Sequence, residues 1–375
     1  MKPKIEQFNL LRISMAFFIL IFHLVLHFKV VFPEGMGLNS FFRMGNILMV
    51  GFFMLSGFVL YYTYHDKEIL NRSSLKNFYI KRFIGIYPVY LFFVIYIYVT
   101  KYGFFKTPLQ TYLALPLELL GLQSLFPQFA NNLGNGGSWF VSVIFLLYLI
   151  FPFLCFYIRN ILKKANFALL FLYLISVYFS VLQAQFGIYL FFNPINRIPE
   201  FLIGMILAKI YIENQKREKK FKNYRIIITI ALYYVAINYL YNLTLFEWLK
   251  FSKSPIYFNV INIPALALII YQLAYIDNKF IISISKNKSI QYLSDLTFTF
   301  YVTQSIALRL GRYVRAKAYF GTTNTSYFKF FIIVFISNLI FAVITHELLE
   351  KPSKKYFNEL FKRSISNSHA SVHNN

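Results

Sequence analysis

The sequence predicts an all-α protein embedded in a membrane, with about ten transmembrane helices. The 375 residues are 58% hydrophobic and 21% aromatic but only 14% charged, a composition that ordinary soluble domains do not have. The apolar residues also form many uninterrupted runs of about 18–22 residues, the length that crosses the hydrocarbon core of a bilayer as a helix.

Ten apolar runs define the predicted spans. They cover residues 8–28, 45–64, 82–100, 139–158, 166–185, 197–213, 226–245, 257–276, 292–311 and 328–348. The stretch 109–126 is apolar too, but Pro116 and Glu118 interrupt it. We therefore expect an interfacial or re-entrant segment there, with an eleventh span as the alternative. The first run is too long for a cleavable signal peptide and lacks a small-residue cleavage site.

The net charge of +24 indicates a membrane topology. Most Lys and Arg residues lie in short segments between apolar runs, which is the pattern of cytoplasmic loops. We therefore expect both termini in the cytoplasm, a multi-pass protein of the cell membrane in contact with lipid, and no nucleic-acid partner. Arg309, Arg312, Arg315 and Lys317 are exceptions because they fall on the predicted outer side. Either they contact an anionic substrate or headgroup, or the ninth span is misplaced.

We divide the chain into a membrane-embedded domain over residues 1–350 and a cytoplasmic tail over residues 351–375. The tail from Ser364 is rich in Ser, Asn and His, which is typical of a disordered end. The one cysteine, Cys155, lies inside an apolar run and excludes a disulfide framework. No metal is expected, because no His, Asp or Glu cluster has the spacing of metal ligands. The sequence leaves a homodimer open.

The first predicted span carries two polar side chains on one face. Arg12 and His23 are eleven residues apart, which places them about 20° apart around a helix and about 16 Å apart along it. His27 follows one turn later and extends the polar stripe. The structural alternative is an interfacial anchor for Arg12 and an interhelical hydrogen bond for His23. Because a neutral imidazole suits general-base catalysis, we predict Arg12 and His23 as catalytic residues.

The Arg-x10-His pattern is the first of several motifs that follow one another along most of the chain. The others are Gly51-Phe-Phe-Met-Leu-Ser-Gly-Phe58, Lys81-Arg-Phe-Ile-Gly-Ile-Tyr-Pro88, Trp139-Phe-Val-Ser-Val143 with Tyr148 and Pro152, Arg197-Ile-Pro-Glu-Phe-Leu-Ile-Gly204 and Glu350-Lys-Pro352. In this order they resemble the motifs of the acyltransferase-3 family of integral membrane proteins. The resemblance implies an O-acyltransferase that moves an acetyl group from cytoplasmic acetyl-CoA to a hydroxyl of a surface glycan or lipid-linked sugar.

The resemblance assigns the donor site to basic residues at the start of the third span. Lys81 and Arg82 are suited to the phosphates of acetyl-CoA, although a plain cytoplasmic anchor would use the same residues. The second arginine of the family's motif falls at Gly85, which carries no charge. Lys81 or Arg12 would then have to compensate.

Acceptor-binding residues are implied at the outer ends of other spans. Trp139 is a candidate platform for sugar stacking, with an interfacial belt residue as the alternative. Ile144 stands where many relatives carry a carboxylate, so no acid is predicted there. Arg197 and Glu200 are one helical turn apart, and they either line an acceptor pocket or form an intrahelical ion pair.

Tyr301 and Gln304 complete the predicted acceptor site. They occupy the place where many relatives have Tyr-x-x-His. Because an amide forms hydrogen bonds but does not shuttle a proton near neutral pH, this chain would work without a second histidine. His65 and His346 lie near span ends with no evident partner, and we interpret them as structural.

Two other functions account for parts of the sequence. A glycan transporter or flippase would explain the outer basic residues and the polar stripe, but the chain lacks the paired broken helices or two-fold repeat usual in transporters. A sensor or assembly scaffold with a degenerate site would explain Gly85, Ile144 and Gln304. The ordered motifs favour the enzyme.

Overall fold

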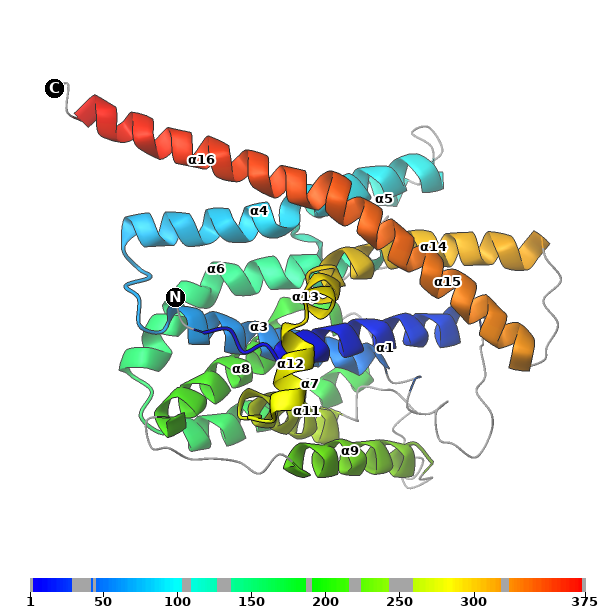
Figure 1. Ribbon diagram of the computed structural model, residues 1–375, viewed down its shortest axis with the longest axis horizontal. Helices are drawn as coiled ribbons and strands as arrows, with labels where there is room; N and C mark the ends of the chain where they lie inside the picture. The colour runs from blue at the N-terminus through cyan, green and yellow to red at the C-terminus, as the bar shows by residue number, and fades with distance from the viewer. Residues whose placement is uncertain are drawn as a thin grey trace.

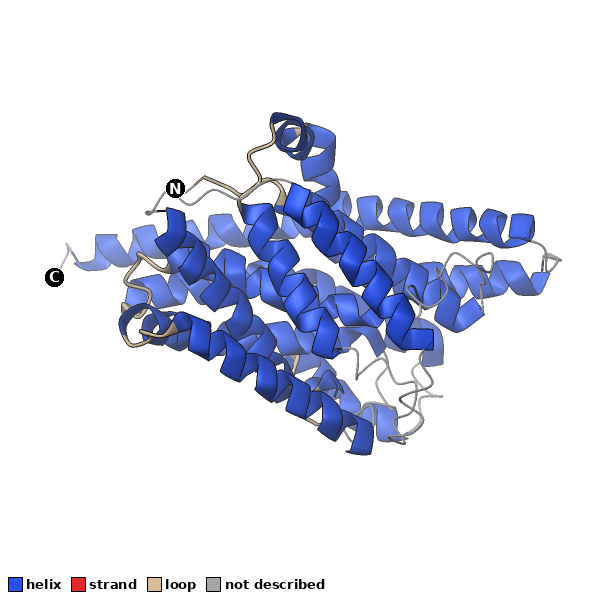
Figure 2. Cartoon of the chain, turned by 90° about the horizontal axis from the view of Figure 1, so that it is seen from below, coloured by secondary structure: helices blue, strands red, loops and turns tan. Residues whose placement is uncertain are grey.

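A computed structural model of the chain describes residues 3–28, 42, 45–102, 109–126, 136–186, 191–215, 224–242, 259–317 and 324–372. Throughout these residues the structure is helical and contains no strand (Figures 1 and 2). The helices are α1 (Phe8–Phe28), α3 (Leu48–Tyr64), α4 (Arg72–Ile97), α5 (Leu109–Leu120), α6 (Trp139–Asn160), α7 (Ala165–Phe186), α8 (Pro194–Gln215), α9 (Tyr224–Asn242), α11 (Asn259–Ala274), α12 (Lys279–Lys286), α13 (Lys288–Asp295), α14 (Thr297–Lys317), α15 (Asn324–Thr345) and α16 (Lys351–Val372). The predicted all-α class is confirmed.

The described helices identify a membrane protein. Those long and apolar enough to cross a bilayer are Phe8–Phe28, Arg72–Thr100, Trp139–Asn160, Ala165–Gln183 and Lys329–Phe361, with a sixth if the pair Ile261–Ala274 and Lys279–Lys286, bent by 93°, counts as one broken span. Several other apolar helices, α3 among them, are shorter. Ten spans and two cytoplasmic termini stay predictions.

Asparagine side chains begin three of the helices. The Oδ1 of Asn71 accepts the backbone N–H of Ser73 at 3.0 Å at the start of α4. Asn278 caps α12 by accepting the N–H of Phe280 at 2.9 Å, and Asn287 begins α13 in the same way. An amide oxygen at this position satisfies a backbone donor that the helix leaves without a partner. These caps set sharp starts for α4, α12 and α13.

The centre of the bundle is a close crossing of α3 and α8. A Cβ on Gly57 would overlap the carbonyl oxygen of Phe201, and a Cβ on Gly204 would overlap the carbonyl oxygen of Met54. The two helices therefore touch through their backbones, which small residues allow in membrane bundles. The surrounding side chains, Phe53, Phe58 and Phe201 among them, are fully buried.

The interrupted apolar stretch before α6 forms the 12-residue helix α5, which is shorter than a span requires. Gly121 ends it with a φ of 68°, a left-handed conformation that glycine adopts without strain. Glu118 is fully buried, and its Oε1 accepts the hydroxyl of Ser138 at 2.9 Å. The amide of Gln123 donates to the carbonyl and hydroxyl oxygens of Ser138, both at 3.0 Å. These bonds tie α5 to the start of α6.

The range 292–311, predicted as the ninth span, is not one continuous helix. It is broken at Leu296, between α13, which ends at Asp295, and α14, which runs from Thr297 to Lys317. The hydroxyl of Thr297 donates to the carbonyl of Ser294 at 2.7 Å across this break. Arg309 of α14 donates to the hydroxyl of Thr100 at 3.0 Å. The side chains of Arg315 and Lys317 lie outside the described residues.

Helix α16 occupies the segment that the sequence predicted as a tail with a disordered end. A π-helical turn at His346–Glu350 joins it to α15, and the helix continues to Val372. In Figure 1 α15 and α16 form one long diagonal rod that extends past the rest of the bundle. The domain boundary at residue 350 stays a prediction, and residues 373–375 lie outside the described part of the chain.

The α3–α8 crossing yields a stability prediction. Gly204→Val places side-chain carbons against the backbone of α3, where no rotamer change relieves the overlap, so we expect a loss of about 3 kcal/mol or more. Thermal unfolding of the detergent-purified protein should show a large fall in Tm or little folded material. Gly85→Ala is the matched control, because a Cβ at Gly85 meets no described atom within 4 Å. Equal Tm values for the two variants would contradict the close crossing.

Candidate functional site

A cavity of about 1110 Å³ lies among α1, α3, α4, α6, α13, α14 and the start of α16. Its rim includes the exposed residues Pro3, Lys4, Asp66 and Lys67. Its wall combines apolar side chains from the α3 core with polar side chains from the surrounding helices. The size and the mixed wall suit a large amphipathic ligand that enters from the rim.

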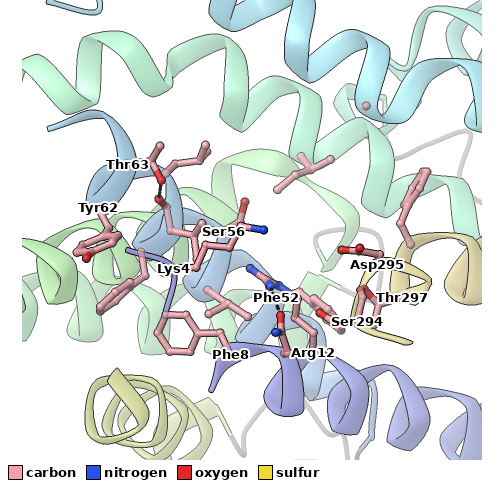
Figure 3. A pocket seen from close by; sticks show the side chains of 18 of the residues that line it. Lys4, Phe8, Arg12, Phe52, Ser56, Tyr62, Thr63, Ser294, Asp295 and Thr297 are labelled. Carbon is pink, nitrogen blue, oxygen red and sulfur yellow. Dashed lines mark hydrogen bonds between the residues drawn. The ribbon is translucent and has the colours of Figure 1, made fainter. Parts of the chain in front are cut away.

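Arg12 projects from α1 into this cavity. Figure 3 shows it beside Ser294 and Asp295 of α13, with Ser56 of α3 close by. Its Nη1 donates to the Oδ1 of Asn9 at 3.3 Å, and the Asp295 carboxylate lines the same cavity. The guanidinium is therefore oriented by a neighbour on its own helix and faces a cavity that also contains a carboxylate.

Arg82 enters the same cavity from α4. Its guanidinium carbon lies 5.6 Å from the centroid of the Phe78 ring and 5.7 Å from that of Tyr148. The Arg82 Nε is buried and makes no hydrogen bond to a described residue. The Tyr148 hydroxyl is fixed in turn by Ser56, at 3.2 Å. Two cations from different helices, Arg12 and Arg82, thus line one cavity, an arrangement suited to an anionic ligand.

The neighbouring Lys81 is exposed and lies outside the cavity lining. Consecutive residues on a helix point about 100° apart, so Arg82 and Lys81 cannot both face the cavity from α4. Gly85, one turn after Arg82, does line the cavity. The expectation that Lys81 would compensate for the missing charge at Gly85 has no support in this geometry.

Aromatic rings close the inner end of the cavity. The Phe140 ring lies 6.2 Å from that of Phe52 and 5.4 Å from that of Tyr301, centroid to centroid, and all three residues line the cavity. The Tyr301 hydroxyl donates to the carbonyl of Gly137 at 3.0 Å. On α1 the lining ends at Ala16.

His23 does not line this cavity, contrary to the expectation that it would share one cavity with Arg12. The α1 face that carries Arg12 and Ala16 continues through Leu20, which is fully buried in an apolar cluster with α14, and Phe52 packs against this cluster. On α1, Leu20 thus lies between Ala16, where the cavity lining ends, and His23. The Nδ1 of His23 is buried without a hydrogen-bond partner among the described residues, and its ring stacks on His27 with centroids 5.9 Å apart.

Gln304 lies on the α14 surface that faces α1. Helical spacing places it with Phe300, Ala307 and Leu308, which share the cluster of Leu20. Its side chain is buried, and neither its Oε1 nor its Nε2 has a hydrogen-bond partner within the described part of the chain. A buried amide left in this state is uncommon, so the α1–α14 contact contains polar groups able to receive a ligand.

The other predicted acceptor residues lie in the protein core, outside the cavity lining. Trp139 is buried among the rings of Phe53, Phe191 and Phe192. Arg197 and Glu200 are 1% and 2% exposed and form an ion pair of 2.5 Å on α8. The Arg197 Nε also donates to the carbonyl of Phe191 at 3.1 Å. The second nitrogen and oxygen of the pair, Nη2 and Oε2, have no described partner.

Sequence reasoning missed the cavity residues of α13 and of the α15–α16 turn. Asp295 and Glu350 both line the cavity. His346, interpreted as a residue with no partner, contacts Glu350 with its Nδ1 2.7 Å from the Oε2, and Lys354 contacts the other carboxylate oxygen at 2.5 Å. The signal was the spacing of four residues from His346 to Glu350 to Lys354, which brings side chains together on a helix.

Comparison with protein families identifies the chain. A family model described as an acyltransferase domain matches residues 5–347. The chain belongs to the acyltransferase-3 family. It is therefore a membrane acyltransferase, and the cavity with Arg12 and Arg82 lies within the matched acyltransferase domain. The search of curated proteins and the search of solved structures return no match.

The buried ion pair of this acyltransferase generates a test of its role. Glu200→Leu leaves the Arg197 charge buried without its partner, and we expect a loss of about 3–5 kcal/mol. The double variant Arg197→Met with Glu200→Leu should recover most of that loss, because both charges are then gone. Thermal unfolding of the purified proteins measures both effects. A single Glu200→Leu variant that folds normally but binds the acceptor poorly would instead support a role in the acceptor pocket.

Proposed function

We propose that this acyltransferase moves an acetyl group from cytoplasmic acetyl-CoA to a hydroxyl of a cell-surface glycan or lipid-linked sugar. The observation that carries the proposal is the large cavity with a charged rim and two arginines, Arg12 and Arg82, within the acyltransferase domain. Coenzyme A joins phosphates to a long, neutral pantetheine arm. The cavity has charged residues at its rim and aromatic residues farther in, which matches the order of phosphates and pantetheine arm in coenzyme A.

The donor would bind with its phosphates toward Arg82 and the rim. Guanidinium groups form charge-assisted hydrogen bonds to phosphate oxygens, and the Arg82 Nε has no such bond to a described residue. The pantetheine arm would extend past Arg12 toward the rings of Phe52, Phe140 and Tyr301. The thioester would then lie near these rings.

His23 is the proposed general base. Its imidazole takes the proton of the acceptor hydroxyl as the oxygen attacks the thioester carbonyl. The carbonyl carbon–sulfur bond then breaks, and the departing thiolate takes up a proton to give free coenzyme A. A transient acyl-histidine is the alternative route. For either route the apolar cluster that contains Leu20 would have to open to join the cavity to the imidazole.

Gln304 and Tyr301 are the proposed acceptor-binding residues. The Gln304 amide has a donor nitrogen, Nε2, and an acceptor oxygen, Oε1, and neither has a described partner. Both lie close to the α1 face that carries His23. A sugar hydroxyl needs partners of this kind when it leaves water. We keep Trp139, Arg197 and Glu200 as candidates that would act from the packed core by shaping this pocket.

A histidine substitution tests the chemistry. His23→Ala should lower acetyl transfer by about 100-fold or more, because it removes the base, while coenzyme A binding persists. Transfer of radiolabel from acetyl-CoA to membrane glycan measures the acetyl transfer, and calorimetry of the purified protein measures coenzyme A binding. His65→Ala serves as the control and should retain activity. Undiminished transfer by His23→Ala would remove His23 from the mechanism, and glycan that crosses the membrane unlabelled in the wild type would favour the transporter.

A pair of neighbouring substitutions tests the donor site. Arg82→Met should raise the KM for acetyl-CoA about tenfold or more, since a charge-assisted phosphate contact is lost, with little change in kcat. Lys81→Met should leave the KM near the wild-type value because Lys81 lies outside the cavity. Equal effects of the two substitutions would mean that the phosphates bind at the surface of α4.

A further inference from the structure

The cavity has a cationic side chain that comes from beyond the matched acyltransferase domain. The family match ends at residue 347, whereas the cavity lining continues into α16 and includes Glu350 and Lys354. The Lys354 side chain is 40% exposed, so its ammonium lies at the boundary between the cavity and solvent. A charged anionic ligand in the cavity would meet this side chain.

Two contacts fix how α16 lies against α4, which Figure 1 shows as neighbouring helices. The Lys76 Nζ lies 5.8 Å from the centroid of the Phe361 ring. Leu349 packs in a cluster with Val89 and Phe93. Higher residue numbers on one helix thus meet lower numbers on the other, so the helices are antiparallel. In this register Lys354 lies opposite the turn of α4 that begins at Arg82.

The Lys354 ammonium is held in position by Glu350 and keeps N–H groups that can bond to a ligand. It donates to the Oε1 of Glu350 at 2.5 Å, and the Oε2 of Glu350 contacts His346. Glu350 is 3% exposed, so the carboxylate is a fixed support. An ammonium group has three N–H donors, which leaves two that can bond to a ligand.

Within the cavity lining, the neighbouring turn of α4 provides one cation. That turn contributes Arg82, Gly85 and Ile86 to the wall. Gly85 carries no side chain, and a Cβ there would meet open space among the described residues. A ligand with several phosphate charges therefore finds two cations on adjoining helices, Arg82 on α4 and Lys354 on α16.

We propose that Lys354 of α16 binds a phosphate group of the acyl-CoA donor together with Arg82 of the adjoining α4. The proposal rests on the proposed donor for this site. It makes α16 part of the donor site, and it gives the buried His346–Glu350 pair the role of positioning the ammonium.

The test compares three variants of the full-length protein in detergent. Lys354→Met should raise the KM for acetyl-CoA and the Kd for coenzyme A about tenfold, with kcat unchanged. Lys354→Arg should keep near-wild-type values because the charge persists. Lys355→Met, an exposed neighbour outside the lining, should also leave both constants unchanged. Thermal unfolding confirms that the variants fold.

A rescue experiment uses the open space at Gly85. Adding Gly85→Arg to Lys354→Met should restore much of the coenzyme A affinity, since the new guanidinium supplies the missing charge to the same ligand. Unchanged affinity in Lys354→Met, or an equal loss in Lys355→Met, would overturn the proposal. Failure of the wild type to bind coenzyme A at all would instead overturn the proposed donor, and wild-type calorimetry separates these results.

Discussion

The backbone contact between α3 and α8 is the constraint on which the site depends. Gly57 and Gly204 let the two helices approach until main-chain atoms meet. With that side of α3 taken by α8, the opposite side, which carries Phe52 and Ser56, is turned toward α1, α4 and α6 and becomes a wall of the cavity. The cavity is therefore a consequence of where α3 can pack. Side chains of any size at the two glycines would move that wall.

Much of the fold followed from hydropathy and charge alone. Apolar runs located α1, α6, α7 and α15, because lipid leaves a spanning chain few alternatives to a helix. The break at Leu296 and the helix α16 were missed because hydropathy alone does not reveal them. Both depend on polar residues whose conformation is decided by local caps and by contacts with other helices. Hydropathy does not register either.

The candidate site was predictable in part. Arg12 and Arg82 were expected to bind one donor, and the structure brings both into one cavity. The choice between Arg82 and Lys81 needed the orientation of α4, which two adjacent basic residues cannot reveal. The spacing of Arg12 and His23 predicts a shared helix face, but a sequence pattern cannot show that Leu20, which lies between them on α1, is packed in an apolar cluster.

The rim of the cavity joins segments that are far apart in the sequence, since Lys4 and Lys354 both line it. During synthesis, the ribosome releases these two residues at very different times. A nascent chain with most of its helices already inserted would still lack the part of the cavity lining that the start of α16 supplies. The cavity is therefore completed only when nearly the whole chain has been synthesised.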